Sequence, residues 1–380
     1  MFLSNMFSRK IFRLVAMLAL VFSLLSTGVG SALAANDAPG AVYVQTNQSS
    51  GNEIAIFSRA ADGTLSLSGT VSTGGLGTGA GLGSQGSVVL SNNGRWLFAV
   101  NAGSNDISVF RVTSNGLALI GTVSSGGVMP TSLTLYKDLL YVLNAGGTGN
   151  ITGFVIDNSG QLTPLSGSTR PLSNNGVGAS PAPAQVAFSR DGSMLVVTER
   201  ASNLIDTYVV GKDGLASGPT AHPSSGATPF GFAFTQQGAL IVSEAFGGAP
   251  LASAVSSYDV SNGSLEVISG SVPTGQTAAC WIAVSKNGKF AYSTNAGSGS
   301  VSAYHVHPDG SLSLIDGAAG ITGDGTSPID ASVSNNGQYL YVLNGRTHNI
   351  SAFAIQADGT LVSIGTFEDL PAGSAGIVAW

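Results

Sequence analysis

A short turn that ends in glycine recurs at regular intervals along this chain. Each turn is an Asp-Gly, Asn-Gly or Ser-Gly pair followed by a run of strand-forming residues. The seven turn glycines are Gly63, Gly116, Gly160, Gly214, Gly263, Gly310 and Gly359. Their mean spacing is about 49 residues, and a period of this length with four strand-like segments is typical of a β-propeller blade. The sequence therefore predicts an all-β fold, a seven-bladed β-propeller of four-stranded blades.

The amino-terminal residues have the order of a secretory signal peptide. This order consists of the basic residues Arg9, Lys10 and Arg13, the apolar run 14–25 and the small-residue site Ala32-Leu33-Ala34. We expect residues 1–34 to be a cleaved signal peptide and residues 35–380 to form one propeller domain. The mature protein would then be secreted, to the extracellular space or the periplasm, with no membrane span.

Composition excludes several classes of partner. Charged residues make up only 9% of the chain, and the formal net charge is −6. The chain therefore lacks the basic surface that nucleic acid or anionic lipid would require. Its single cysteine, Cys280, cannot form an internal disulfide. We expect a monomer that binds a small molecule and needs no cofactor.

The two faces of the predicted disc differ in their loops. The turns from the first to the second strand and from the third to the fourth strand are tight and rich in Asn-Gly and Asp-Gly. The connections at the other face are long and irregular, namely 74–86, 171–184, 219–229, 245–254 and 317–328. Long loops on a rigid scaffold commonly carry binding and catalysis. We therefore expect the working surface on this loop-bearing face.

The first repeat lacks an inner strand, because the chain after the signal peptide enters directly into a second-strand pattern at residues 41–44. A surplus strand-like tail, residues 375–380, follows the complete seventh repeat. We predict that this tail supplies the missing inner strand and closes the ring. Closure would remove two exposed sheet edges.

The corners between the second and third strands carry the most informative residues. Asn101, Asn144, Asn295 and Asn344 share one position in their repeats, whereas the fourth and fifth repeats have Glu199 and Glu244 there. The asparagines are predicted to bond the corner backbone. Two facing carboxylates in adjacent blades would share a proton and perform general acid or base catalysis. The alternative is that the glutamates are solvated carboxylates at the rim.

Other polar and aromatic residues complete the candidate site. Arg200 follows Glu199 and is a candidate catalytic residue. The candidate ligand-binding residues are Gln185, Phe230, Trp281, Asn295, Asn344 and Arg346. The aromatic residues would suit either sugar stacking or core packing. His305 and His307 alternate onto one face of an outer strand, but a third ligand is missing, so we expect no metal site.

The repeats resemble a known family. Ser-x-Asp/Asn-Gly turns, strands ending in Tyr-Val-x-Asn and Asp-Gly-x-Leu turns are similar to the seven-bladed lactonase propellers, which include bacterial 6-phosphogluconolactonase and fungal carboxymuconate-lactonizing enzyme. The resemblance covers essentially all of residues 35–380. The enzymes of that family carry Pro-His-x-His and Asp-Leu-Gly-x-Asp in the fourth blade. Here residues 181–184 read Pro-Ala-Pro-Ala and residues 199–203 read Glu-Arg-Ala-Ser-Asn, so both histidines are absent and a carboxylate remains as Glu199.

The resemblance implies an exported lactonase that hydrolyses or forms a lactone of a sugar acid or a muconate-like compound. Glu199 or Glu244 would then activate water, and Arg200 would stabilise the developing oxyanion. The alternative function is noncatalytic. An exported propeller of this kind would bind a glycan, a peptide or a cell-wall ligand through its loop-bearing face.

Overall fold

The computed structural model describes residues 40–380, so the predicted signal peptide lies outside the described part of the chain. The described residues belong to one compact unit, Pro39–Trp380. The one helix in residues 40–380 is the short 3-10 helix η1 (Phe246–Gly248). No helix in this range has the length and apolar character needed to cross a membrane.

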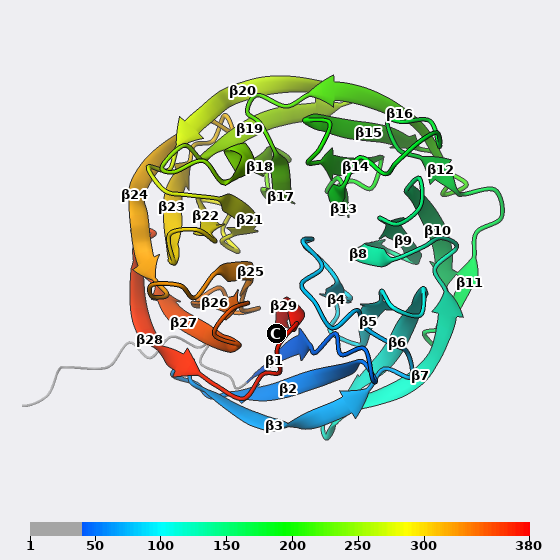
Figure 1. Ribbon diagram of the computed structural model, residues 1–380, viewed down its shortest axis with the longest axis horizontal. Coiled ribbons are helices and arrows are strands. Elements are labelled where there is room, and N and C mark those ends of the chain that lie inside the picture. Colours follow the sequence, from blue (N-terminus) through cyan, green and yellow to red (C-terminus); the bar gives the residue numbers. More distant parts are fainter. Residues whose placement is uncertain (1–39) are drawn as a thin grey trace, which may run out of the picture. The chain divides into compact units, whose positions relative to one another are not determined.

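The strands form seven antiparallel sheets that surround a central axis like the blades of a propeller (Figure 1). This arrangement confirms the predicted fold. From the axis outward, blade 1 contains β29 (Ala375–Ala379), β1 (Gly40–Gln45), β2 (Glu53–Arg59) and β3 (Leu65–Ser72); blade 2 contains β4 (Val88–Leu90), β5 (Trp96–Asn101), β6 (Asp106–Thr113) and β7 (Gly116–Ser124); blade 3 contains β8 (Pro130–Tyr136), β9 (Leu139–Asn144), β10 (Asn150–Ile156) and an outer strand divided into β11 (Leu162–Pro164) and β12 (Arg170–Pro171).

The other four blades follow the same order without division of a strand. Blade 4 contains β13 (Pro183–Phe188), β14 (Met194–Glu199), β15 (Leu204–Val210) and β16 (Ala216–Pro223); blade 5 contains β17 (Pro229–Phe234), β18 (Leu240–Glu244), β19 (Ala254–Ser261) and β20 (Ser264–Pro273); blade 6 contains β21 (Ala279–Val284), β22 (Phe290–Asn295), β23 (Ser300–Val306) and β24 (Leu312–Ile321); blade 7 contains β25 (Pro328–Val333), β26 (Tyr339–Asn344), β27 (Asn349–Ile355) and β28 (Leu361–Phe367).

The second strand of a blade is buried on both of its faces. Every residue of β5, β14, β22 and β26 is buried. The cause is that neighbouring blades cover both faces, which explains why these strands read as continuous apolar runs. The core therefore lies between blades. Phe98 and Val100 of β5, for example, pack against Leu140 and Val142 of β9.

The recurrent turn glycines lie between the third and fourth strands, with positive φ values such as 86° at Gly63 and 87° at Gly359. Side chains other than glycine rarely adopt this conformation. Three of these turns, those at Gly63, Gly214 and Gly359, also accept a hydrogen bond from a tyrosine hydroxyl of the preceding blade. Tyr341 donates to the Gly63 carbonyl at 2.8 Å, and Tyr292 donates to the Gly359 carbonyl at 3.1 Å.

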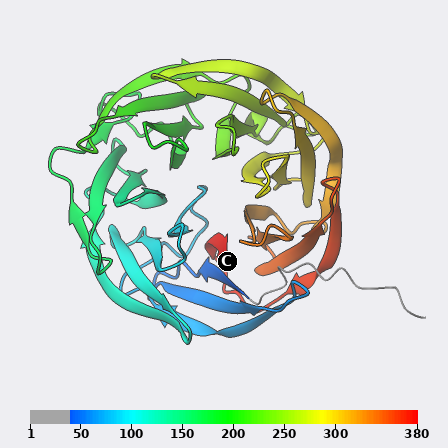
Figure 2. The same ribbon diagram turned by 180° about the vertical axis from the view of Figure 1, so that it is seen from behind.

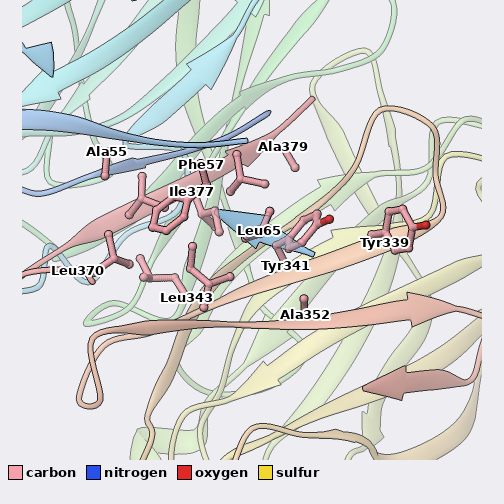
Figure 3. Close-up of a cluster of buried hydrophobic side chains, with 13 residues drawn as sticks. Ala55, Phe57, Leu65, Tyr339, Tyr341, Leu343, Ala352, Leu370, Ile377 and Ala379 are labelled. Carbon is pink, nitrogen blue, oxygen red and sulfur yellow. The ribbon is translucent and has the colours of Figure 1, made fainter. Parts of the chain in front are cut away.

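The carboxyl-terminal strand β29 closes the ring, as the sequence predicted. It pairs with β1 in antiparallel register, with Ile377 opposite Val44. Figure 3 shows Ile377 and Ala379 within a buried cluster that also includes Phe57 of β2 and Leu343 of β26. The last strand is thereby fixed to the first and the last repeats together.

The connection between β3 and β4 enters the centre of the ring in both views of the molecule (Figures 1 and 2). We call its residues 82–87 the channel strap. The strap makes hydrogen bonds to three different blades. Ser84 Oγ donates to Thr131 O at 2.8 Å, Gln85 N donates to Ala184 O at 3.1 Å, and the Gln85 side chain bonds both main-chain groups of Ile282. The strap therefore links blades 3, 4 and 6 across the axis.

Candidate functional site

Each corner residue predicted from the repeats ends the second strand of its blade. These residues are Asn101 of β5, Asn144 of β9, Glu199 of β14, Glu244 of β18, Asn295 of β22 and Asn344 of β26. All six side chains are completely buried. Glu199 and Glu244 are therefore not solvated carboxylates at the rim.

The corner asparagines of blades 6 and 7 are bonded within their own blades. Asn295 Nδ2 donates to Ser302 Oγ at 2.9 Å, and Asn344 Nδ2 donates to Ser351 Oγ at 2.8 Å. These bonds fit the structural role expected for the asparagines. Asn295 and Asn344 are fully buried in this conformation, and their role in ligand binding stays a prediction.

Glu199 is surrounded by hydrogen-bond donors. Its Oε1 accepts the Ser173 N–H at 3.0 Å, and its Oε2 accepts the hydroxyls of Ser173 at 2.5 Å and Ser202 at 2.6 Å. Ser173 belongs to the long connection between blades 3 and 4, and Ser202 belongs to the corner itself. The carboxylate therefore ties this connection to the corner of blade 4.

Glu244 has an equivalent set of donors in blade 5. Its Oε1 accepts the Gly226 N–H at 2.8 Å and the Ser256 hydroxyl at 2.5 Å, and its Oε2 accepts the Ser271 hydroxyl at 2.7 Å. A Cβ on Gly226 would lie 2.3 Å from Glu244 Oε2. Only glycine therefore allows the connection to approach the carboxylate so closely.

The expected sharing of a proton between Glu199 and Glu244 finds no support in this conformation, because no hydrogen bond joins the two carboxylates and they have no hydrogen-bond partner in common. The carboxyl group beside Glu199 is instead Asp206 of β15. Sequence reasoning missed Asp206. Its spacing of seven residues from the corner, equal to the spacing from Asn295 to Ser302, was the available signal.

Arg200 differs from Glu199 in that its side chain is partly exposed. Its main-chain N–H and its Nε–H both donate to Ala182 O, at 3.2 and 3.1 Å. Its guanidinium carbon lies 5.0 Å from the ring centroid of Phe230. Neither terminal nitrogen has a hydrogen-bond partner within residues 40–380. Burial lowers the pKa of Arg200, but a guanidinium stays cationic in proteins.

Arg200 is also distinct among the blades. The residue that follows the corner is small in the other blades with this corner, namely Ala102, Ala145, Ala245, Ala296 and Gly345. An arginine at this position of blade 4 alone places one cation in an otherwise uncharged series. The geometry therefore suits the binding of a single anionic group.

The surroundings of Arg200 are apolar. Phe230, Cys280 and Trp281 belong to a buried cluster at the inner ends of blades 4 to 6. The rings of Phe230 and Trp281 lie 4.8 Å apart, and Trp281 Nε1 donates to Ser84 O of the channel strap at 2.8 Å. Both aromatic side chains are at most 6% exposed. They form the floor beneath Arg200 and offer little surface for direct sugar stacking.

Two further predicted ligand-binding residues lie in different environments. Gln185 is buried, and its amide donates to Phe232 O at 2.9 Å and accepts the Phe232 N–H at 2.7 Å. The amide is thereby used to join blades 4 and 5. Arg346 is exposed on the loop-bearing face of blade 7. A role of Arg346 in ligand binding remains a prediction.

The described residues contain no group of three or more His, Cys, Asp or Glu side chains that could hold a metal ion. His305 and His307 do lie side by side, with ring centroids 4.6 Å apart. A hollow of about 300 Å³ lies on the opposite, turn-bearing face, where Arg95, Trp96 and Lys137 line it. None of the predicted site residues borders this hollow, and its lining contains no unsatisfied buried group.

Comparison with solved structures shows the same fold in several bacterial proteins. A candidate 6-phosphogluconolactonase from Bacteroides fragilis has a TM-score of 0.68 at 21% identity over 90% of this chain and 98% of that one. A Lactobacillus plantarum protein has a TM-score of 0.71 at 19% identity over 90% and 99% of the two chains. A periplasmic gluconolactonase from Pseudomonas aeruginosa has a TM-score of 0.67 at 19% identity over 89% and 98%. Similarity at these identities shows the fold alone.

Sequence comparison identifies the family. No protein of curated function matches the chain. The family described as Lactonase, 7-bladed beta-propeller matches residues 33–171 and 249–380. The match leaves out residues 172–248, the segment that contains Glu199, Arg200 and Glu244. Because the match covers most of the chain, this protein belongs to the lactonase family of seven-bladed β-propellers.

Proposed function

We propose that this protein binds a small lactone, or the acid that the lactone yields, at the channel mouth on its loop-bearing face. The observation that carries the proposal is Arg200, whose two terminal nitrogens lack a partner within residues 40–380. Its position over Phe230 fixes the guanidinium while leaving these donors free. A planar guanidinium suits a carboxylate or a developing oxyanion.

Lactone hydrolysis develops negative charge on the carbonyl oxygen when water attacks. A cation held in apolar surroundings would stabilise that oxyanion more strongly than a solvated one. Arg200 would supply this stabilisation and would also bind the carboxylate of the product. Neither Glu199 nor Glu244 reaches solvent in this conformation, so the proposal assigns no general-base role to either carboxylate.

The proposed substrate class is an unphosphorylated sugar-acid lactone. A phosphate group favours a cluster of cations, whereas the small residues that follow the other corners leave Arg200 alone in their series. The periplasmic gluconolactonase from Pseudomonas aeruginosa has the same fold, which supports a lactone outside the cytoplasm. The predicted signal peptide supports the same placement.

A panel of lactones tests this function. Purified residues 35–380 would be assayed for ring opening of glucono-1,5-lactone, its 6-phosphate and muconolactone, and for binding of gluconate by calorimetry. The proposal expects glucono-1,5-lactone to be hydrolysed faster than its 6-phosphate. Gluconate binding without turnover of any lactone would favour the noncatalytic alternative. Absence of both binding and turnover would contradict the proposal.

A further inference from the structure

Blade 4 has two carboxyl groups where other blades have an amide and a hydroxyl. In blades 2, 6 and 7 the corner asparagine donates to a serine seven residues later on the third strand. The three pairs are Asn101 with Ser108 (2.7 Å), Asn295 with Ser302 (2.9 Å) and Asn344 with Ser351 (2.8 Å). Blade 4 has Glu199 and Asp206 at these two positions. An amide and a hydroxyl bond directly, but two carboxyl groups need a proton between them.

The surroundings of the two carboxyl groups differ. Both side chains are completely buried. Glu199 accepts three hydrogen bonds from Ser173 and Ser202. Neither oxygen of Asp206 has a partner at standard hydrogen-bonding geometry. The neighbouring carboxyl of Glu199 acts on Asp206 more strongly than the Ser173 N–H does. Because donors stabilise the charged form, the negative charge belongs on Glu199 and the proton on Asp206.

Few other charged groups face this pair. Burial and the charge of Glu199 raise the pKa of Asp206 to about 8. Tyr208 is the other titratable neighbour, and burial together with the two carboxylates raises its pKa as well. The Tyr208 hydroxyl donates to Pro171 O at 2.9 Å. No cation acts on the pKa of Asp206 in the described part of the chain. Two unpaired buried charges would lower the stability of the fold, and a proton shared between the two carboxyl groups avoids this cost.

This pair adjoins Arg200. Glu199 immediately precedes Arg200, and it holds Ser173 on one side and Ser202 on the other. The corner then presents Arg200 to Ala182 through two hydrogen bonds. Loss of the shared proton would leave two neighbouring negative charges in a buried site, and their repulsion would displace the corner.

We propose that Glu199 and Asp206 share one proton at neutral pH and that this proton fixes the corner of blade 4, which makes Asp206 a positioning residue for Arg200. The sharing of the proton stands on the geometry of the pair. Its consequence for ligand affinity rests on the proposed function.

The chain itself offers the matched variant. The double substitution Glu199→Asn with Asp206→Ser installs the pair that blades 2, 6 and 7 already use. Asp206→Asn keeps a hydrogen-bond donor toward Glu199 but cannot titrate. Asp259→Asn, at an exposed carboxylate of β19, controls for loss of one negative charge. All variants would be compared with the parent by infrared spectroscopy, by thermal melting across pH, and by calorimetry with gluconate.

The proposal expects the parent at pH 7 to show the infrared carbonyl band of a protonated carboxyl that Asp206→Asn removes. The melting temperature of the parent should fall as the pH rises from about 5 to about 8, because the folded pair keeps a proton that the unfolded chain releases. This fall should be smaller in Asp206→Asn and in the double variant, but unchanged in Asp259→Asn. Gluconate affinity of the parent should weaken severalfold above pH 8, and that of the double variant should not.

Other results would overturn the proposal. Infrared spectra and melting profiles that are the same in parent and Asp206→Asn would exclude the shared proton. A melting temperature that Ca²⁺ raises in the parent but not in the double variant would identify a bound cation instead. Gluconate affinity that weakens above pH 8 in the double variant as much as in the parent would exclude positioning. If gluconate binds at no pH, the proposed function fails. Nitrogen-15 spectra then test positioning separately: the Arg200 Nε–H signal, assigned by its loss in Arg200→Lys, should shift above pH 8 if the corner moves. A signal that stays constant would exclude positioning.

Discussion

The side-chain amide of Gln85 forms hydrogen bonds with both main-chain groups of Ile282, as the backbone of a neighbouring strand would. It donates to the Ile282 carbonyl at 2.7 Å and accepts the Ile282 N–H at 3.1 Å, although 197 residues separate the two. This contact connects the channel strap of blade 2 to the inner strand of blade 6. It places protein at the axis of the ring. The strap also passes close to Arg200, since a Cβ on Gly83 would lie 3.0 Å from Arg200 Nη1.

The strap contact predicts a measurable loss of stability. Gln85→Ala should lower the free energy of unfolding by about 1–3 kcal/mol, because it leaves both main-chain groups of Ile282 without a partner in a buried site. Urea unfolding monitored by tryptophan fluorescence would measure this loss. Gln161→Ala, at an exposed side chain, is the control and should change stability by less than about 0.5 kcal/mol. Equal stabilities of the two variants would show that the strap contributes nothing to the ring.

Ring closure predicts a second stability effect. Ile377→Ala should cost about 2–5 kcal/mol, because it empties part of the cluster between blades 1 and 7. Val362→Ala removes a side chain that is 53% exposed and should cost far less. Deletion of residues 373–380 should expose the edge of β1 and produce aggregation. A soluble truncated protein that melts at the parent temperature would contradict closure by β29.

The repeat period and the parity of the strands were sufficient to predict the blades, the two faces and the closing strand. These features depend on local turn chemistry and on apolar runs, which every repeat contains. The corner residues were also placed at the right structural position. Their surroundings were not predicted, because burial of Glu199 depends on Ser173, a residue of the connection between blades 3 and 4 whose approach leaves no local pattern.

The strap was predicted only as a long loop. Its glycine-rich sequence indicates an irregular path but does not say that Gln85 crosses the axis to Ile282. Arg200 was assigned to the site with Glu199 as its partner. The structure separates the two, since Glu199 is buried inside the corner and the Arg200 side chain is partly exposed. Adjacent residues on a strand point in opposite directions, and the corner keeps that difference.

Asp330 predicts a dependence of stability on pH. Its carboxylate accepts the N–H groups of Ala331 at 2.9 Å and Ile377 at 3.3 Å, and burial raises its pKa to about 7. The unfolded chain loses this proton near pH 4, so the folded state binds more protons between about pH 4 and pH 7. Stability should therefore fall as the pH rises through this range.

Asp330→Asn tests this origin of the pH dependence. The variant should be less stable than the parent at about pH 5, because an amide cannot accept at both positions. Its stability should also change less between about pH 5 and pH 8, by up to about 1.4 kcal/mol for each unit of pH. Urea unfolding at several pH values would measure both effects. Parallel pH profiles for the two proteins would rule out Asp330 as the source.

Substitution of Glu244 would show whether this carboxylate has a structural or a catalytic role. Because its oxygens accept bonds from Gly226, Ser256 and Ser271, Glu244→Gln should lower stability by about 1–3 kcal/mol. Turnover of glucono-1,5-lactone per folded molecule should stay within about twofold of the parent. A loss of about 100-fold at unchanged stability would instead identify Glu244 as a general acid or base. Glu266→Gln, at an exposed carboxylate of β20, is the matched control.

The central claim is that Arg200 holds the anionic group of the ligand at the channel mouth, and gluconate affinity measured by calorimetry on Arg200→Gln tests it most directly. Arg190→Gln is the control, because Arg190 is an exposed arginine in a turn of the opposite, turn-bearing face. The account predicts that Arg200→Gln weakens gluconate binding by about 10-fold to 100-fold, as loss of a charge-assisted bond would, while the melting temperature stays near that of the parent. Gluconate binding that is equal in the parent and in Arg200→Gln would contradict the account.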